Sequence, residues 1–194
     1  MNIKLKHLKE KKYLITAALI FAAVNIFLNT GKFYSQSKYK YVGANTCVGA
    51  CHKSEIQGNQ FEVWNQSAHS KAYLTLKTEK ADSIAAQKGF TSPAAETQEC
   101  IKCHTLGKET DEKVFQASFD ITQGVQCESC HGPGSAYSKL SIMKDKEKAK
   151  SKGLILHSEK EKFCIECHNP ESPTYFEFDY DSMWKMIAHS KPKE

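Results

Sequence analysis

One segment of the chain, residues 60–76, combines apolar and polar positions with the period of an α-helix. Phe61, Trp64, Ala68 and Ala72 recur at intervals of three or four residues, which puts them on one stripe of a helix. The pattern predicts a single amphipathic helix that packs through this stripe.

Outside this segment the predicted elements are short. Residues 105–124 are mostly polar and predict only a short hairpin or loop. Residues 139–152 predict a lysine-rich helix. A last helix is predicted to begin at Asp179 or Asp181, which can cap its N-terminus, and to run to His189. Short helices joined by long connections predict a mainly α fold with extensive loop.

The N-terminus has the pattern of an export signal. A group of lysines precedes an apolar run over residues 14–28. The uncharged stretch, residues 13–31, would span about 28 Å as a helix, close to the hydrocarbon thickness of a membrane. We therefore predict that residues 1–37 are a signal peptide, cleaved near Ser35-Gln36-Ser37, or a signal anchor with its lysines on the cytoplasmic side. The lysines are Lys4, Lys6, Lys9, Lys11 and Lys12.

The same segment accounts for the formal net charge of +5. Residues 1–37 contain six Lys and one Glu, whereas residues 38–194 contain 21 Lys and 21 acidic residues, so the exported part is neutral. No Arg occurs in the sequence. Because the basic charge is a targeting feature and not a surface for polyanions, nucleic-acid binding is excluded. The lysines of residues 144–152 form a solvated face, a docking patch for an acidic redox partner, or a set of charges that compensates haem propionates.

All eight cysteines lie beyond residue 37 in four pairs, and a histidine follows each pair directly. The pairs are Cys47 and Cys51, Cys100 and Cys103, Cys127 and Cys130, and Cys164 and Cys167. The histidines are His52, His104, His131 and His168. Cys-x-x-Cys-His is the attachment motif of c-type haem: two thiols about one turn apart reach the two vinyl groups of one porphyrin edge, and the adjacent His is the proximal iron ligand. The first pair has three intervening residues, a longer variant. The sequence therefore predicts four covalently bound c-type haems.

Three other uses of paired cysteines fit less well. Two four-cysteine zinc sites give no reason for a His after every second Cys. Disulfides suit an exported protein but leave the four histidines unexplained as well. Thioredoxin-like chemistry needs one Cys-x-x-Cys on a βαβ unit, and not four in a strand-poor sequence.

Three histidines remain beyond the N-terminal segment as candidate distal ligands of the haem irons. They are His69, His157 and His189. Seven histidines cannot fill eight axial positions, so one iron is predicted to be five-coordinate or to have a weaker ligand. Reserve ligands are Met143, Met183 and Met186, although Met at helical spacing more often fills a core.

Two segments resemble the multihaem cytochromes c of the cytochrome c-554 family. Residues 64–72 read Trp-Asn-Gln-Ser-Ala-His-Ser-Lys-Ala, similar to the W-x-x-S-x-H-x-x-A motif of that family. Residues 124–134 read Gly-Val-Gln-Cys-Glu-Ser-Cys-His-Gly-Pro-Gly and resemble its G-V-x-C-E-x-C-H-G-P-G stretch around a central haem. A softer likeness at residues 172–175 and 184–189 extends the resemblance over about residues 41–190.

The resemblance implies a tetrahaem electron-transfer protein of the periplasm, with three bis-His haems and one five-coordinate haem. It also implies that His69 crosses over to the third haem. Between His104 and Cys127, where the family has a distal ligand, this chain has no His, and His189 is the candidate for that role.

Taken with the motifs, these features predict a signal segment, residues 1–37, and a tetrahaem cytochrome c domain, residues 38–194. The domain has too few residues for a conventional side-chain core around four porphyrins, so the haems are predicted to form the core. The protein would be periplasmic, soluble or anchored to the inner membrane through residues 13–31, and would transfer electrons between respiratory partner proteins. The alternative is a haem enzyme acting on a small nitrogen oxide or oxygen species at one five-coordinate haem. No catalytic constellation favours the enzyme.

Overall fold

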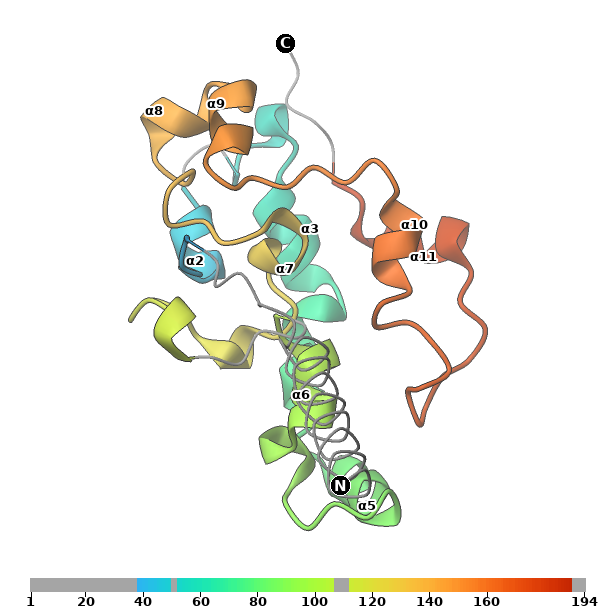
Figure 1. The fold of residues 1–194 in the computed structure, drawn as a ribbon. Coiled ribbons are helices and arrows are strands. Elements are labelled where there is room, and N and C mark those ends of the chain that lie inside the picture. The colour runs from blue at the N-terminus through green and yellow to red at the C-terminus, as the bar shows by residue number, and fades with distance from the viewer. Residues whose placement is uncertain (1–37, 50–51, 107–111, 190–194) are drawn as a thin grey trace, which may run out of the picture. The chain divides into compact units, whose positions relative to one another are not determined.

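The computed structural model describes residues 38–49, 52–106 and 112–189, which belong to one compact unit, Ser37–Glu194 (Figure 1). The predicted signal or anchor, residues 1–37, lies outside the described residues, and so does Cys51 of the first attachment motif. Among the residues that are described, no helix is long and apolar enough to cross a membrane.

The fold is mainly α with extensive loop, as predicted. Short α-helices are interspersed with 3-10 turns as far as α7, and α7 to α11 follow one another without a 3-10 turn. The α-helices are α2 (Ala44–Cys47), α3 (Gln60–Gln66), α4 (Ala72–Thr75), α5 (Glu79–Gln87), α6 (Gln98–His104), α7 (Cys127–His131), α8 (Leu140–Met143), α9 (Lys146–Ser151), α10 (Lys160–Cys164) and α11 (Tyr180–Ile187). The 3-10 turns are η1 (Glu55–Gln57), η2 (His69–Lys71), η3 (Ala94–Glu96), η4 (Glu112–Val114) and η5 (Ile121–Gln123). One isolated β-bridge joins Tyr41 to Phe115.

The single helix predicted for residues 60–76 was wrong, because the segment is broken into α3, η2 and α4. The break is at Ser67, whose backbone is extended. Its backbone N–H and its hydroxyl both donate to the carbonyl of Trp64, at 3.0 and 2.7 Å. A serine side chain that binds the preceding turn competes with the helical hydrogen bonds, so the helix ends and the chain turns into the segment that carries His69.

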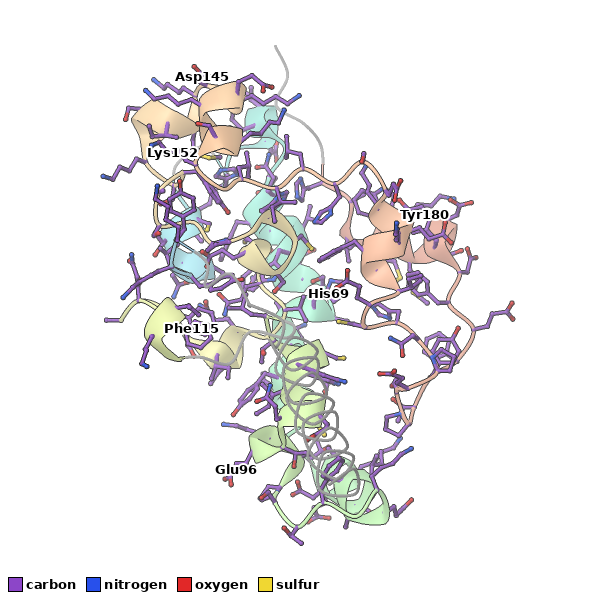
Figure 2. All side chains as sticks on the ribbon, in the orientation of Figure 1. His69, Glu96, Phe115, Asp145, Lys152 and Tyr180 are labelled. Atoms are coloured by element: carbon purple, nitrogen blue, oxygen red, sulfur yellow. The ribbon has the colours of Figure 1, made fainter. Side chains whose placement is uncertain are left out.

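The lysine-rich segment is likewise two helices, α8 and α9, and not the single helix predicted. Asp145 begins α9, because its carboxylate accepts a hydrogen bond from the backbone N–H of Lys148 at 2.9 Å. Asp145 and Lys152 flank α9 in Figure 2 and are both exposed. The docking patch therefore stays a prediction, since exposed lysines are expected for a solvated face, for a docking patch and for charge compensation of haem propionates.

The last predicted helix is confirmed as α11. Asp179 caps it by accepting hydrogen bonds from the backbone N–H groups of Asp181 and Ser182, at 3.1 and 3.4 Å. The helix ends at Ile187, so His189 follows on an extended segment. Lys160 of α10 lies 4.4 Å from the ring centre of Trp184 and ties α10 to α11.

Burial of apolar side chains is sparse in the described residues. The core cluster consists of Leu76, Ala85 and Ala94, with Phe90 and Cys100 partly buried against it. This cluster supports the second attachment motif and little else. The sequence predicted that the haems form the core, and the small side-chain core agrees with this prediction.

Large apolar side chains are exposed next to the attachment motifs. Leu74, Ile155 and Ile165 are 45–51% exposed. Ile165 lies inside the fourth motif, and Ile155 contacts the third. About half of each of these side chains is left uncovered by the polypeptide, which suits them to contact a porphyrin.

Candidate haem-binding sites

The attachment motifs lie on short helices that bring the two cysteines and the histidine of a motif together. The second motif forms the end of α6, and the third motif is the whole of α7. In the fourth motif, α10 ends at Cys164 and a turn continues to His168, whose backbone N–H binds the Cys164 carbonyl at 3.0 Å. Residues three and four apart share one face of a helix, which is the arrangement that attachment of one porphyrin requires.

Main-chain carbonyl groups orient two of the proximal histidines. Nδ1 of His131 donates to the carbonyl of Ile155 at 3.1 Å, and Nδ1 of His104 donates to the carbonyl of Ala72 at 2.7 Å. Because Nδ1 carries the proton in each ring, Nε2 keeps the lone pair that binds a metal. The rings are thus held in the tautomer that a proximal ligand needs.

Two pairs of histidine rings lie at a spacing that two ligands of one iron would have. The ring centres of His131 and His189 are 5.9 Å apart, and those of His69 and His168 are 6.0 Å apart. A metal–imidazole bond is about 2 Å long and the ring centre lies about 1 Å beyond the nitrogen, so two imidazoles on opposite sides of one metal have centres about 6 Å apart. The residues therefore fit a bis-His haem at the third and fourth motifs.

The protonation state of these rings agrees with metal binding. Burial lowers the pKa of His69 and of His131 from the usual value, and the neighbouring His168 lowers that of His69 further. A lowered pKa keeps the imidazole neutral at physiological pH, and the neutral form is the one that binds a metal.

The family resemblance implied that His69 crosses over to the third haem, and this pairing stays a prediction. The ring of His69 lies nearest that of His168 in the fourth motif, and the ring of His189 lies near that of His131 in the third. His69 is carried by the turn η2 (Figure 2). This turn is fixed by the residues that directly precede the third motif, as follows.

The backbone carbonyl and the backbone N–H of Val125 both bind the segment that carries His69. The indole Nε1 of Trp64 donates to the Val125 carbonyl at 2.7 Å, and the Val125 N–H donates to the His69 carbonyl at 2.9 Å. Gly124 makes the approach possible: a Cβ atom there would lie 2.4 Å from the His69 carbonyl oxygen, and its φ is +69°. Both motifs are visible in the sequence, but no sequence pattern indicates that Gly124 and Val125 dock one motif onto the other.

The third candidate distal ligand, His157, is placed differently. Nε2 of His157 donates to the Cys130 carbonyl at 2.6 Å, and its ring stacks on Phe163 with centres 4.1 Å apart. His157 and His52 both lie near enough to His131 to lower its pKa, although burial is the larger cause. The first and third motifs and His157 are therefore neighbours.

Thiols from different motifs also meet. Cys47 of the first motif is hydrogen-bonded to Cys127 of the third, which raises the pKa of Cys47 and lowers that of Cys127. Cys167 of the fourth motif is hydrogen-bonded to Cys103 of the second, which raises the pKa of Cys167. The first motif thus neighbours the third, the second neighbours the fourth, and Cys130 of the third also lies near the cysteines of the fourth.

Comparisons with known proteins indicate the class to which the chain is similar. The family described as "Cytochrome c554 and c-prime" matches residues 46–132, which include the first three motifs. Cytochrome c-554 of Nitrosomonas europaea is 26% identical over 209 aligned residues, covering 91% of this chain and 84% of that protein. No solved structure matches the chain.

The attachment motifs and these matches define a c-type cytochrome, with covalently bound haem and a role in electron transfer. Within that class the chain is similar to the cytochrome c-554 family, in line with the resemblance of its motifs.

Replacing Gly124 by alanine should dislodge the turn that carries His69. Because the new Cβ would collide with a backbone carbonyl at a positive φ, we expect a loss of about 3 kcal/mol of unfolding free energy. Thermal unfolding measures this loss, and electron paramagnetic resonance should show one low-spin haem becoming high-spin.

Gly89→Ala is the matched control. Gly89 has a similar φ of +88°, but nothing lies within 4 Å of a Cβ atom there. It should cost about 1 kcal/mol or less and leave the spin states unchanged. Equal effects of the two variants would contradict the docking of His69 through Gly124.

Proposed function

We propose that the protein is an exported tetrahaem c-type cytochrome that passes electrons between redox partner proteins of the periplasm. The observation that carries the proposal is the adjacency of the attachment motifs: α2 of the first motif contacts α7 of the third, and Cys103 and Cys167 neighbour each other. Adjacent motifs favour haems held close together, which suits transfer of electrons along the chain of cofactors. The periplasmic location rests on the N-terminal pattern and on the family.

The chain's contribution is to bind and orient the haems. When bound, haem supplies a one-electron iron couple whose potential depends on axial ligands, hydrogen bonding and burial. The cysteines of each motif attach the porphyrin, and its histidine takes the proximal position. Main-chain acceptors at Ala72 and Ile155 keep the rings of His104 and His131 from turning.

The distal ligands are proposed from the distances between rings. His189 is assigned to the iron of the third motif and His69 to that of the fourth, since their ring centres lie 5.9 and 6.0 Å from the proximal histidines. His157 and the first motif's His52 both lie near His131. Because the third iron already has two histidines, His157 is assigned to the first, through Nδ1, since its Nε2 donates to the Cys130 carbonyl.

This assignment leaves the iron of the second motif with His104 alone. The histidine count supports the same conclusion, since three distal candidates serve four irons. The second site is therefore proposed to be five-coordinate or weakly ligated. An open iron position is necessary for the alternative function, reduction or oxidation of a small nitrogen oxide or oxygen species, but does not by itself make an enzyme.

The mature protein should carry four haems and accept four electrons. Intact mass should exceed that of the polypeptide by four haem groups, and coulometric titration should take up four electrons per chain, because each motif attaches one haem. A surplus of three haems would mean that Cys47 and Cys51, with their longer spacing, are not an attachment site.

Removing either paired distal ligand should change the spin state of one haem. His69→Ala and His189→Ala should each convert one low-spin haem to high-spin while all four haems stay attached, because the thioether bonds do not involve these residues. Electron paramagnetic resonance of the oxidised variants measures the change. Unchanged spectra would mean that His69 and His189 are not axial ligands.

The reduced wild-type protein should bind carbon monoxide at about one equivalent per chain, because one iron lacks a histidine on its distal side. Optical titration gives the stoichiometry. If no carbon monoxide binds and every haem is low-spin, the enzyme alternative fails and electron transfer alone remains. If it binds, turnover of a nitrogen oxide with an electron donor is the further requirement for an enzyme.

A further inference from the structure

The two largest fully buried side chains in the described part of the chain are both polar. Gln126 and Glu128 are 2% and 1% exposed, and both belong to the third attachment motif or precede it directly. Haem attachment itself needs only the two cysteines and the histidine, so it gives no reason to bury these two side chains. Burial of a carboxylate is costly unless it is well hydrogen-bonded.

The carboxylate of Glu128 is bound entirely by backbone N–H groups. Oε1 accepts from Val42 at 2.9 Å and from Gly134 at 2.6 Å, and Oε2 accepts from Gly43 at 2.7 Å and from Val42 at 2.9 Å. Because every partner is a donor, the ionised form satisfies all of these bonds. Burial raises the pKa of Glu128, and the hydrogen bonds from the three backbone groups oppose that rise.

Gln126 binds the same segment one residue further on. Its Oε1 accepts from the backbone N–H of Ala44 at 2.7 Å, and its Nε2 donates to the carbonyl of Asp120 at 2.8 Å. Ala44 begins α2, the helix that ends at Cys47. The first N–H groups of a helix lack partners within that helix, so side chains of the third motif complete the start of the helix that carries the first motif.

These bonds join α2 to α7, which lie side by side (Figure 1). Tyr137 is also buried and binds the end of α7: it is 5% exposed, and its hydroxyl donates to the Gly132 carbonyl at 2.7 Å. Gly43 itself approaches closely, since a Cβ atom there would lie 2.9 Å from the Ser118 carbonyl oxygen. The first turn of one attachment helix is thereby fixed to the other, three residues before Cys47.

We propose that Gln126 and Glu128 are positioning residues that set the geometry of the first haem relative to the third, and that the charge of Glu128 lowers the reduction potential of these haems. This inference rests on the proposed function, since it assumes a haem at each of the two motifs. Among the described residues no cation forms an ion pair with Glu128. An uncompensated negative charge in a low-dielectric interior stabilises the oxidised, more positive iron.

Charge and geometry can be separated by two variants. Glu128→Gln has nearly the same shape but no charge, so potentiometric titration should show the potential of one or two haems shifted upward. Glu128→Asp keeps the charge but shortens the side chain, so it cannot reach both Val42 and Gly134. In this variant the potentials should stay near the wild-type values, while the split Soret band in circular dichroism, which reports coupling between neighbouring haems, should weaken.

Glu166→Gln is the matched control, because Glu166 occupies a middle position of the fourth motif but is exposed. Water screens its charge, so its removal should leave potentials and the Soret band unchanged. Intact mass checks that each variant carries the same number of haems as the wild type.

The inference is overturned if Glu128→Gln matures fully and shifts no potential more than Glu166→Gln does. It is also overturned if Glu128→Asp leaves the split Soret band at full strength. Should Glu128→Gln lose haem, the Soret band of Glu128→Asp decides the positioning role by itself. A failure of the proposed function would be seen in the wild type, as fewer than four haems or electrons, and is therefore distinguishable.

Discussion

The orientation of the histidine rings depends on main-chain groups that come from distant parts of the chain. The carbonyl of Ile155 holds His131, the carbonyl of Ala72 holds His104, and the peptide of Val125 holds the turn of His69. In each case the partner is more than twenty residues away, so a ring adopts its orientation only when the tertiary structure has formed. Because an axial ligand must present Nε2 along one direction, these bonds decide which rings can share an iron.

The small side-chain core makes these polar contacts more important than in an ordinary globular protein. A cluster around Leu76, Ala85 and Ala94 supports the second motif, and the rest of the described chain buries few apolar side chains. Exposed apolar groups such as Ile155 and Ile165 flank the motifs instead. Haem therefore supplies both the redox chemistry and much of the apolar surface around which the loops pack.

The third motif is the centre of this arrangement. Gly124 and Val125, directly before it, hold the turn of His69, while Gln126 and Glu128 hold the start of the helix that carries the first motif. One short stretch thus binds two other segments through backbone groups. The likeness of residues 124–134 to a relative's central haem stretch has a physical explanation in these contacts, since several of its residues serve packing and not attachment.

The attachment sites could be predicted from the sequence because their chemistry is local. Two thiols and an imidazole must lie within about one helical turn, and that requirement is visible as Cys-x-x-Cys-His in a linear sequence. The capped last helix was predictable for the same reason, since Asp179 binds N–H groups only two and three residues away. Only the tertiary structure decided that His69 faces His168 and that His189 faces His131. It also decided that the helix predicted over residues 60–76 breaks at Ser67, where docking onto Val125 prevails over the helical pattern. Partners far apart in sequence leave no periodic signal, and their choice depends on which backbone groups meet when the chain folds.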